Sequence, residues 1–167
     1  MKTTKKMYFY LLLAVGSILY SCKHDQAEFE MHDYEFTDSV YPEMMYQQQL
    51  NLELQNLPSR NEISNFGYKR QKDNKVYLDE LMENTTLQNK APLTDEHLRK
   101  ILLLRRQTPV DLQYLQSLLI ESDQKMIGYH VKASGALGLI NANLREWSQT
   151  KLKYLTADLN DIQHLIK

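Results

Sequence analysis

The chain is poor in cysteine, glycine and proline. Cys22 is the only cysteine among 167 residues, so no disulfide can form within the chain and no site built from several cysteine ligands is available. Five glycines and four prolines leave long uninterrupted stretches, and no segment shows the apolar and polar alternation typical of a strand. The abundant Leu, Gln, Glu, Lys and Met are good helix formers. The sequence therefore predicts an all-α protein.

The chain also lacks a strong net charge, with 20 basic and 21 acidic residues. The charges are unevenly placed: residues 23–38 hold six acidic side chains and one lysine, whereas residues 39–167 hold 16 basic and 15 acidic ones. A nearly neutral body argues against nucleic-acid binding, which needs a basic face. The acidic segment shows no apolar periodicity. We therefore expect an acidic tether over residues 22–38 and one helical domain over residues 39–167.

The first residues have the order of a secretory signal. Three lysines precede a mostly apolar run, and a small residue, Ser21, stands directly before Cys22. The segment Leu19-Tyr20-Ser21-Cys22 looks like a bacterial lipobox, in which the cysteine is acylated and becomes the first residue of the mature protein. The alternative is an uncleaved membrane helix, but residues 7–21 are fewer than the roughly 20 needed to cross a bilayer. We expect a signal peptide over residues 1–21 and lipidation at Cys22.

Lipidation implies a location and a first partner. Two or more acyl chains on one residue anchor stably to a membrane, whereas one chain does not. We expect an outer-membrane lipoprotein of the bacterial envelope, on the periplasmic face rather than the cell surface, because only Asp25 follows Cys22 closely. The expected partners are the membrane, through the lipid on Cys22, and an unknown envelope component.

Stop and start signals divide the body into helices over about 41–57, 60–84, 95–106, 109–134 and 141 to the C-terminus. Pro42 suits a first turn, and Ser59 with Glu62 forms a capping box for the second helix. Thr108 and Pro109 suit the start of the fourth. Four long helices predict a four-helix bundle, with the short helix lying across one end as part of the crossover.

The inward-facing positions repeat every three or four residues, and each row is apolar at its ends and polar near its middle. The expected rows are Ile63, Phe66, Arg70, Asp73, Tyr77 and Leu81 on the second helix; Leu115, Leu118, Ser122, Met126, Tyr129 and Ala133 on the fourth; and Ile140, Leu144, Trp147, Lys151, Tyr154, Asp158, Ile162 and Leu165 on the last.

Short motifs carry a family resemblance from about Glu43 to Lys167. They are Asn51-Leu52-Glu53-Leu54, Phe66-Gly67 followed by Asp73, Pro92-Leu93-Thr94, Pro109-Val110-Asp111 with Tyr114, Leu144-Arg145, and Leu152 to Leu155. In these the chain resembles a family of bacterial outer membrane proteins of unknown function. The resemblance implies a ferritin-like four-helix bundle and an envelope location, but no reaction, because the family has no settled activity.

The chain departs from the family pattern at three histidines. Asn74, Ser122 and Asp158 stand where the family carries imidazoles, which argues against an inherited metal role. A ferritin-like di-iron centre needs two Glu-x-x-His motifs. Here only Asp161-x-x-His164 approaches that motif, once. No glycine-rich phosphate loop and no Gly-x-Ser-x-Gly motif is present. We therefore expect no metal, no cofactor and no catalytic residue.

One set of residues is a candidate site in the bundle interior: Glu53, Arg70, Asp73, Asn74, Ser122 and Asp158. They fall near the middle of their helices, and a buried charge is costly unless it is paired. One interpretation is a structural polar layer in which Arg70 bridges Asp73 or Asp158. The other is a remnant site for a hard cation or a small polar ligand. We expect a non-enzymatic binding or structural module; the alternative is a metal-binding or enzymatic ferritin-like protein that uses the bundle interior.

Overall fold

The computed structural model describes residues 30–57, 61–85 and 92–165, and this part of the chain is all-helical. Its helices are α2 (Asp33–Gln55), α3 (Asn61–Asn84), α4 (Asp95–Arg105), α5 (Leu112–Ser134) and α6 (Ala142–Gln163). The predicted all-α class is thereby confirmed. The predicted signal peptide and Cys22 lie outside the described residues. Among the helices described, none is both long and apolar enough to cross a membrane.

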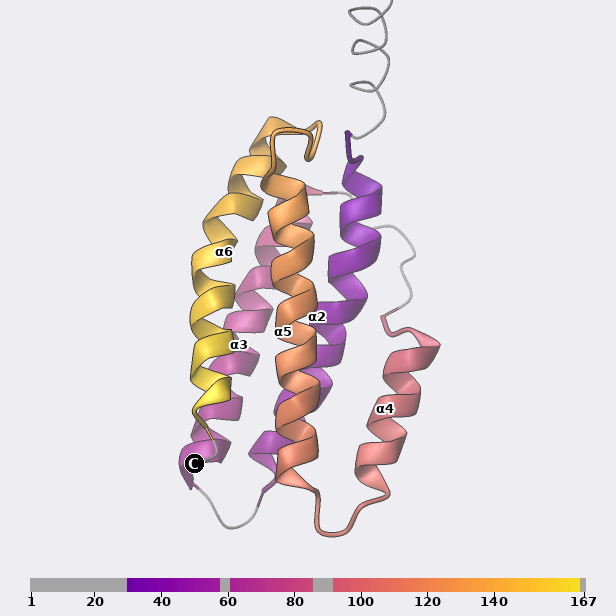
Figure 1. Ribbon diagram of the computed structural model, residues 1–167, viewed down its shortest axis with the longest axis vertical. Helices are drawn as coiled ribbons and strands as arrows, with labels where there is room; N and C mark the ends of the chain where they lie inside the picture. Colours follow the sequence, from indigo (N-terminus) through magenta and orange to yellow (C-terminus); the bar gives the residue numbers. More distant parts are fainter. Residues whose placement is uncertain (1–29, 58–60, 86–91, 166–167) are drawn as a thin grey trace, which may run out of the picture. The chain divides into compact units, whose positions relative to one another are not determined.

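The four long helices lie alongside one another as a bundle (Figure 1). Helix α2 packs against α3 and α5, and α5 packs against α6, which also meets α3. In each of the pairs α2–α3 and α5–α6 the two helices run in opposite directions, whereas α3 and α5 run the same way. The connection from α3 to α5 therefore returns along the length of the bundle. Helix α4 lies in this crossover, as predicted, but it runs along the outer side of α2 rather than across one end of the bundle.

The bundle interior has two apolar ends and a polar middle. One apolar cluster is formed by the start of α2, the end of α3 and the α5–α6 turn, and includes Phe36, Leu81 and Met126. The other lies at the opposite end of the helices and includes Leu54 and Leu115. Between them the buried side chains are polar: Gln47, Asn51, Arg70, Asn74, Ser122 and Asp123. The expected division into apolar ends and a polar middle is confirmed for α3 and α5, whereas in the middle of α6 the buried residue is Leu155.

The domain begins earlier than predicted. Helix α2 starts at Asp33, inside the expected tether, and Pro42 lies within the helix rather than in its first turn. Phe36 is 1% exposed and Met31 is 9% exposed, so both belong to the core. The Met31 N–H donates to the Gly138 carbonyl and the Met31 carbonyl accepts from the Ile140 N–H, at 3.0 and 3.1 Å. A helical body starting at residue 39 would lack these contacts, and the compact unit begins at Met31.

Two further helix starts can be compared with the predictions. The Thr94 hydroxyl accepts the His97 N–H and caps α4, as expected of a threonine directly before the helix. The cap of α5 is Asp111, whose carboxylate accepts the N–H groups of residues 113 and 114, so the prediction of Thr108 as the cap was wrong. The predicted cap Ser59 lies outside the described residues.

Several predicted inward positions were displaced by one residue. On α3 the buried positions are Gly67 and Asn74 rather than Phe66 and Asp73. On α6 Leu155 is buried, whereas the predicted Tyr154 is 65% exposed. On α5 His130 is buried beside the predicted Tyr129, which is only half-buried. The displacement arises because the buried face of a helix is broad. The spacing of apolar residues in the sequence is then compatible with either of two neighbouring positions being buried.

Gly67 permits the close approach of α3 to α2. A Cβ atom at this position would lie 2.9 Å from the Asn51 carbonyl oxygen and 2.9 Å from the Leu54 Cβ. We expect Gly67→Ala to lower the free energy of unfolding by about 1–3 kcal/mol, because overpacking outweighs the helix propensity gained. Gly128→Ala on α5 is the matched control, since nothing lies within 4 Å of its Cβ. The free energy of unfolding of this control variant should rise by about 1 kcal/mol, because alanine has the higher helix propensity. Equal effects in urea denaturation would contradict the close approach.

Candidate functional site

A buried ion pair occupies the middle of the bundle. Arg70 on α3 and Asp123 on α5 are both almost inaccessible to solvent. The guanidinium donates two hydrogen bonds to the carboxylate, from Nη2 to Oδ1 at 2.6 Å and from Nη1 to Oδ2 at 3.0 Å. This bidentate geometry is the strong form of the arginine–carboxylate pair. Burial raises the pKa of the Asp123 carboxyl, and the Arg70 guanidinium opposes that rise.

Amide side chains complete the polar layer. The Arg70 Nε donates to the Asn51 Oδ1 at 3.3 Å, and the Gln47 Nε2 donates to the Asp123 Oδ1 at 2.9 Å. The Asn74 Nδ2 in turn donates to the Gln47 Oε1 at 3.4 Å. The layer therefore joins α2, α3 and α5 through side chains alone. Each of the three guanidinium nitrogens donates one hydrogen bond, which offsets part of the cost of burying the charge.

The predicted site residues divide into three groups. Arg70, Asn74 and Ser122 lie in the buried layer. Asp158 lies at its edge, with an Oδ2 atom 4.0 Å from the Arg70 Nη1 and a side chain 17% exposed. Glu53 does not belong to the layer, because it pairs on the outside with the Arg105 Nε at 2.7 Å.

Asp73, the remaining predicted residue, is also outside the layer. It is about half-exposed and pairs with Lys69 at 3.3 Å on its own helix. The expected Arg70–Asp73 bridge was therefore wrong, and the expected bridge to Asp158 is only a long contact beside the main pair with Asp123. Three layer residues were missed: Gln47, Asn51 and Asp123. For Asp123 a signal existed, since it directly follows the predicted Ser122 on a helix with a broad buried face.

The layer contains two polar atoms without a partner among the residues described, the Asn51 Nδ2 and the Ser122 Oγ. The charge of Arg70 is countered by Asp123, while Asp158 adds a second carboxylate at the edge. Burial raises the pKa of Asp158, and the nearby Arg70 and Lys69 oppose the rise. The Arg70 guanidinium is held in place by its hydrogen bonds to Asn51 and Asp123. The layer is therefore suited to holding α2, α3 and α5 together.

A second polar cluster lies in the apolar end that contains Phe36. The His130 Nδ1 is 3.0 Å from the Ser148 carbonyl oxygen, which can only accept, so Nδ1 carries the proton. The Nε2 atom therefore accepts from the Tyr77 hydroxyl at 2.7 Å. Burial lowers the pKa of His130 to about 4 and raises the pKa of Tyr77 well above its usual value. Both side chains are thus neutral near pH 7 and form a satisfied core network.

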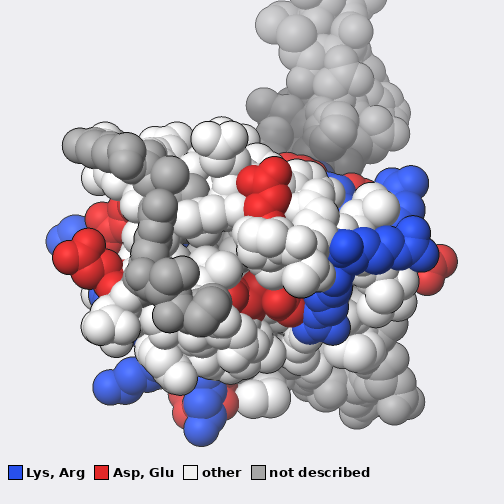
Figure 2. All heavy atoms as spheres, turned by 90° about the horizontal axis from the view of Figure 1, so that it is seen from below, with Lys and Arg blue, Asp and Glu red and all other residues white. Residues whose placement is uncertain are grey.

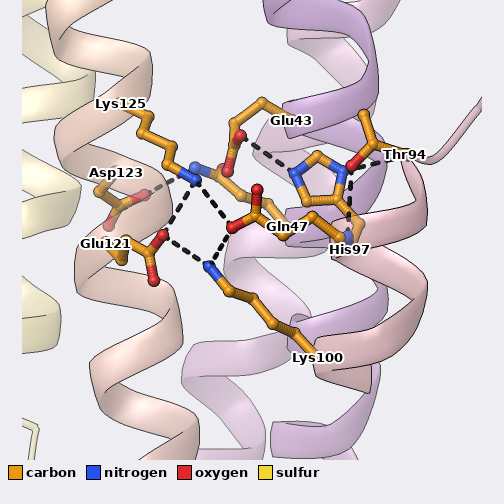
Figure 3. Close-up of polar contacts among 9 residues, drawn as sticks. Glu43, Gln47, Thr94, His97, Lys100, Glu121, Asp123 and Lys125 are labelled. Carbon is orange, nitrogen blue, oxygen red and sulfur yellow. Dashed lines mark hydrogen bonds and ion pairs between the residues drawn. The ribbon is translucent and has the colours of Figure 1, made fainter. Parts of the chain in front are cut away.

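A third cluster joins α4 to α2 (Figure 3). The His97 Nε2 lies 3.2 Å from the Glu43 Oε2, and both side chains are buried. The His97 ring stacks on Tyr46, with centroids 4.4 Å apart and planes inclined by 4°. The same histidine lies next to the Thr94 cap, so one residue helps both to start α4 and to attach it.

Beside this cluster, two lysines and two glutamates form an ion-pair network between α4 and α5. Lys100 lies 2.8 Å from Glu96 and 2.6 Å from Glu121, and Lys125 lies 2.9 Å from Glu121. Exposed pairs of this kind contribute little individually. The network thus links the crossover helix to the bundle.

In each of the three clusters one pair of titratable side chains is in direct contact: Arg70 with Asp123, His130 with Tyr77, and His97 with Glu43. The described residues hold no group of three or more His, Cys, Asp or Glu side chains placed to ligate a metal. Against known proteins, the chain matches no family model, no curated protein and no solved structure.

Proposed function

We propose that the chain is a bacterial envelope lipoprotein, anchored to the outer membrane through acylated Cys22, whose helical bundle is a non-enzymatic binding module. The lipobox and the basic, apolar and small-residue order of the first 22 residues support the anchor. We propose the periplasmic face, because only one acidic residue, Asp25, closely follows Cys22.

The observation that carries the non-enzymatic part is the buried guanidinium of Arg70. It is 0% exposed and fills the middle of the bundle with a positive charge that is bound to Asp123. Ferritin-like metal centres are built at that place, from side chains that project inward from facing helices. Here the Arg70 side chain fills that space and engages the Asp123 carboxylate, so the geometry favours a structural layer over the alternative of a metal-binding or enzymatic bundle.

The helix order supports a ferritin-like fold. Two antiparallel pairs, α2–α3 and α5–α6, are joined by one long crossover, which is the connectivity of that class. The resemblance to the outer membrane family points the same way. At two of the family's histidine positions, Asn74 and Ser122 are buried in the polar layer, so the departure from the family affects the interior directly.

The charges on one end of the bundle favour a partner other than nucleic acid. The end of the bundle seen in Figure 2 carries basic and acidic side chains interspersed, rather than one sign of charge. Nucleic-acid binding needs a continuous basic face. We therefore propose that the partners are the membrane and an envelope component, met through the outer faces of the helices.

The anchor is tested by the single cysteine. When the chain is expressed in a Gram-negative host, we expect labelled palmitate to be incorporated into the native chain and not into Cys22→Ala, because no other thiol is available. The mutant should also keep its signal peptide and run as a larger precursor on a gel. Equal labelling of both chains would refute the anchor. For the interior, a stoichiometric metal in the native chain purified without chelators would favour the metal-binding alternative.

A further inference from the structure

An open groove of about 500 Å³ runs between α3 and α6. Its floor includes Tyr77 and Leu155, and its walls include Val76 and Tyr154, which are 48% and 65% exposed. The two helices are antiparallel, so the groove has one end near Glu80 and another near Asp158. An elongated groove with apolar walls and charged ends suits an extended ligand with an aliphatic middle.

One end of the groove already holds an ammonium group. The Lys151 Nζ pairs with the Glu80 carboxylate, which also accepts the Trp147 Nε1–H at 2.6 Å. The same Nζ lies 5.6 Å from the ring centroids of Trp147 and Tyr154. Desolvation tends to raise the pKa of Glu80, but the hydrogen bonds from Lys151 and Trp147 outweigh it and lower that pKa. At this end of the groove, the Glu80 carboxylate and the rings of Trp147 and Tyr154 thus surround a primary ammonium group.

The charges of the groove are not balanced. Four carboxylates line it, from Asp73, Glu80, Asp158 and Asp161, against two lysines. Both lysines are engaged: Lys151 with Glu80, and Lys69 with Asp73 and Asp158 at 3.3 and 3.9 Å. The groove therefore retains an excess of negative charge for a ligand. Asp73 and Glu80 are seven residues apart, which is about 10 Å along the helix axis at about 1.5 Å per residue.

We propose that this groove binds a linear aliphatic ligand carrying two or more ammonium groups. One ammonium group would lie by the carboxylates of Asp73, Asp158 and Asp161, the chain would lie over Leu155, and another ammonium group would reach the Tyr154 face. The proposal rests on the binding role proposed above and is independent of the Cys22 anchor. The same chemistry is offered by a free polyamine and by a lysine-rich peptide.

The single tryptophan gives a direct measurement. With the full chain in a non-ionic detergent, titration with spermidine and separately with a tri-lysine peptide should change the Trp147 fluorescence saturably, because Trp147 donates to a carboxylate of the groove. N-acetylated spermidine should bind more weakly. Tighter binding of spermidine would identify the free polyamine as the source, and tighter binding of tri-lysine the peptide. If neither amine binds up to millimolar concentration, by fluorescence and by calorimetry, the proposal is wrong, whatever the outcome at Cys22.

Variants locate the binding. Asp73→Asn combined with Asp161→Asn should weaken binding by roughly tenfold, from the loss of two largely exposed charge contacts, and Tyr154→Ala by up to about fivefold. Asp79→Asn is the matched control, because Asp79 is an exposed carboxylate of α3 that does not line the groove. All these positions are exposed, so circular dichroism should show unchanged helix content. Equal weakening by Asp79→Asn, or none by the double variant, would place any bound amine elsewhere.

Discussion

Replacing Arg70 with methionine should lower the free energy of unfolding by about 3–5 kcal/mol, because it leaves the Asp123 carboxylate buried without its cation. The loss should be visible as a shift of the urea midpoint with little change in slope. Such a loss is a large part of the stability of an ordinary domain. Asp73→Asn is the control on the same helix: its side chain is about half-exposed, and the expected change is below about 1 kcal/mol.

A second variant separates pairing from packing. In Arg70→Met combined with Asp123→Leu both charges are gone, and the volume is filled by apolar side chains. Replacement of a buried ion pair by packed apolar residues is often close to neutral, so this variant should recover much of the loss. If Arg70→Met alone is neutral, the buried pair is not formed. If the double variant is as unstable as the single one, the amides of Gln47 and Asn51, left without their charged partners, dominate the cost.

Acidification should destabilise the protein through His130. Its folded pKa is about 4, below the ordinary value of 6.5, because burial disfavours the imidazolium. The unfolded chain therefore takes up a proton at a higher pH than the folded chain does. The stabilising effect of the neutral ring is fully present above about pH 6.5 and is lost as the pH falls toward 4. With 1.36 kcal/mol per pKa unit, the free energy of unfolding should drop by about 3 kcal/mol between pH 7 and pH 4 from this residue alone.

The measurement is a series of urea denaturations from pH 7 to pH 4 on the native chain and on His130→Gln. Glutamine cannot take up a proton, so the drop should be smaller by about 3 kcal/mol in the variant, even if its stability at pH 7 is lower. His164→Gln, at an exposed position after α6, is the control and should retain the native pH dependence. Identical pH profiles for the native chain and His130→Gln would show that His130 is not buried as a neutral group.

The helices could be predicted from the sequence because their apolar rows and breaks are local. The start of α2 could not be predicted in this way, because the apolar residues there stand between several acidic ones. Asp33 and Glu35 favour the helix N-terminus, while Phe36 and Val40 face the core. Reading the segment by charge predicted a tether, whereas the spacing of its apolar residues is helical. The contact of Met31 with the α5–α6 turn is long-range and has no signal in the segment itself.

The candidate site was predictable in kind but not in its contacts. Arg70 was correctly predicted to be buried, because it is a polar residue in the middle of an apolar row. Its partner could not be named, because the reach of an arginine is long and the rotation of α5 about its own axis decides whether Ser122 or Asp123 faces it. For the same reason His130 was overlooked in favour of Tyr129. Helix rotation is set by the packing of all the helices together, so it is not encoded in any one of them.

The polar layer also fixes the axial register of the helices. Toward both ends of the bundle the buried faces of the helices are apolar, so a slip of one turn, about 5.4 Å, would exchange one apolar contact for a similar one. The Arg70–Asp123 pair has no such neighbour to exchange with, because its hydrogen bonds are 2.6 and 3.0 Å long and the clusters on either side are apolar. A slipped bundle would bury two separated charges in hydrocarbon. The layer therefore selects one alignment from several that hydrophobic packing alone would leave nearly equal in energy.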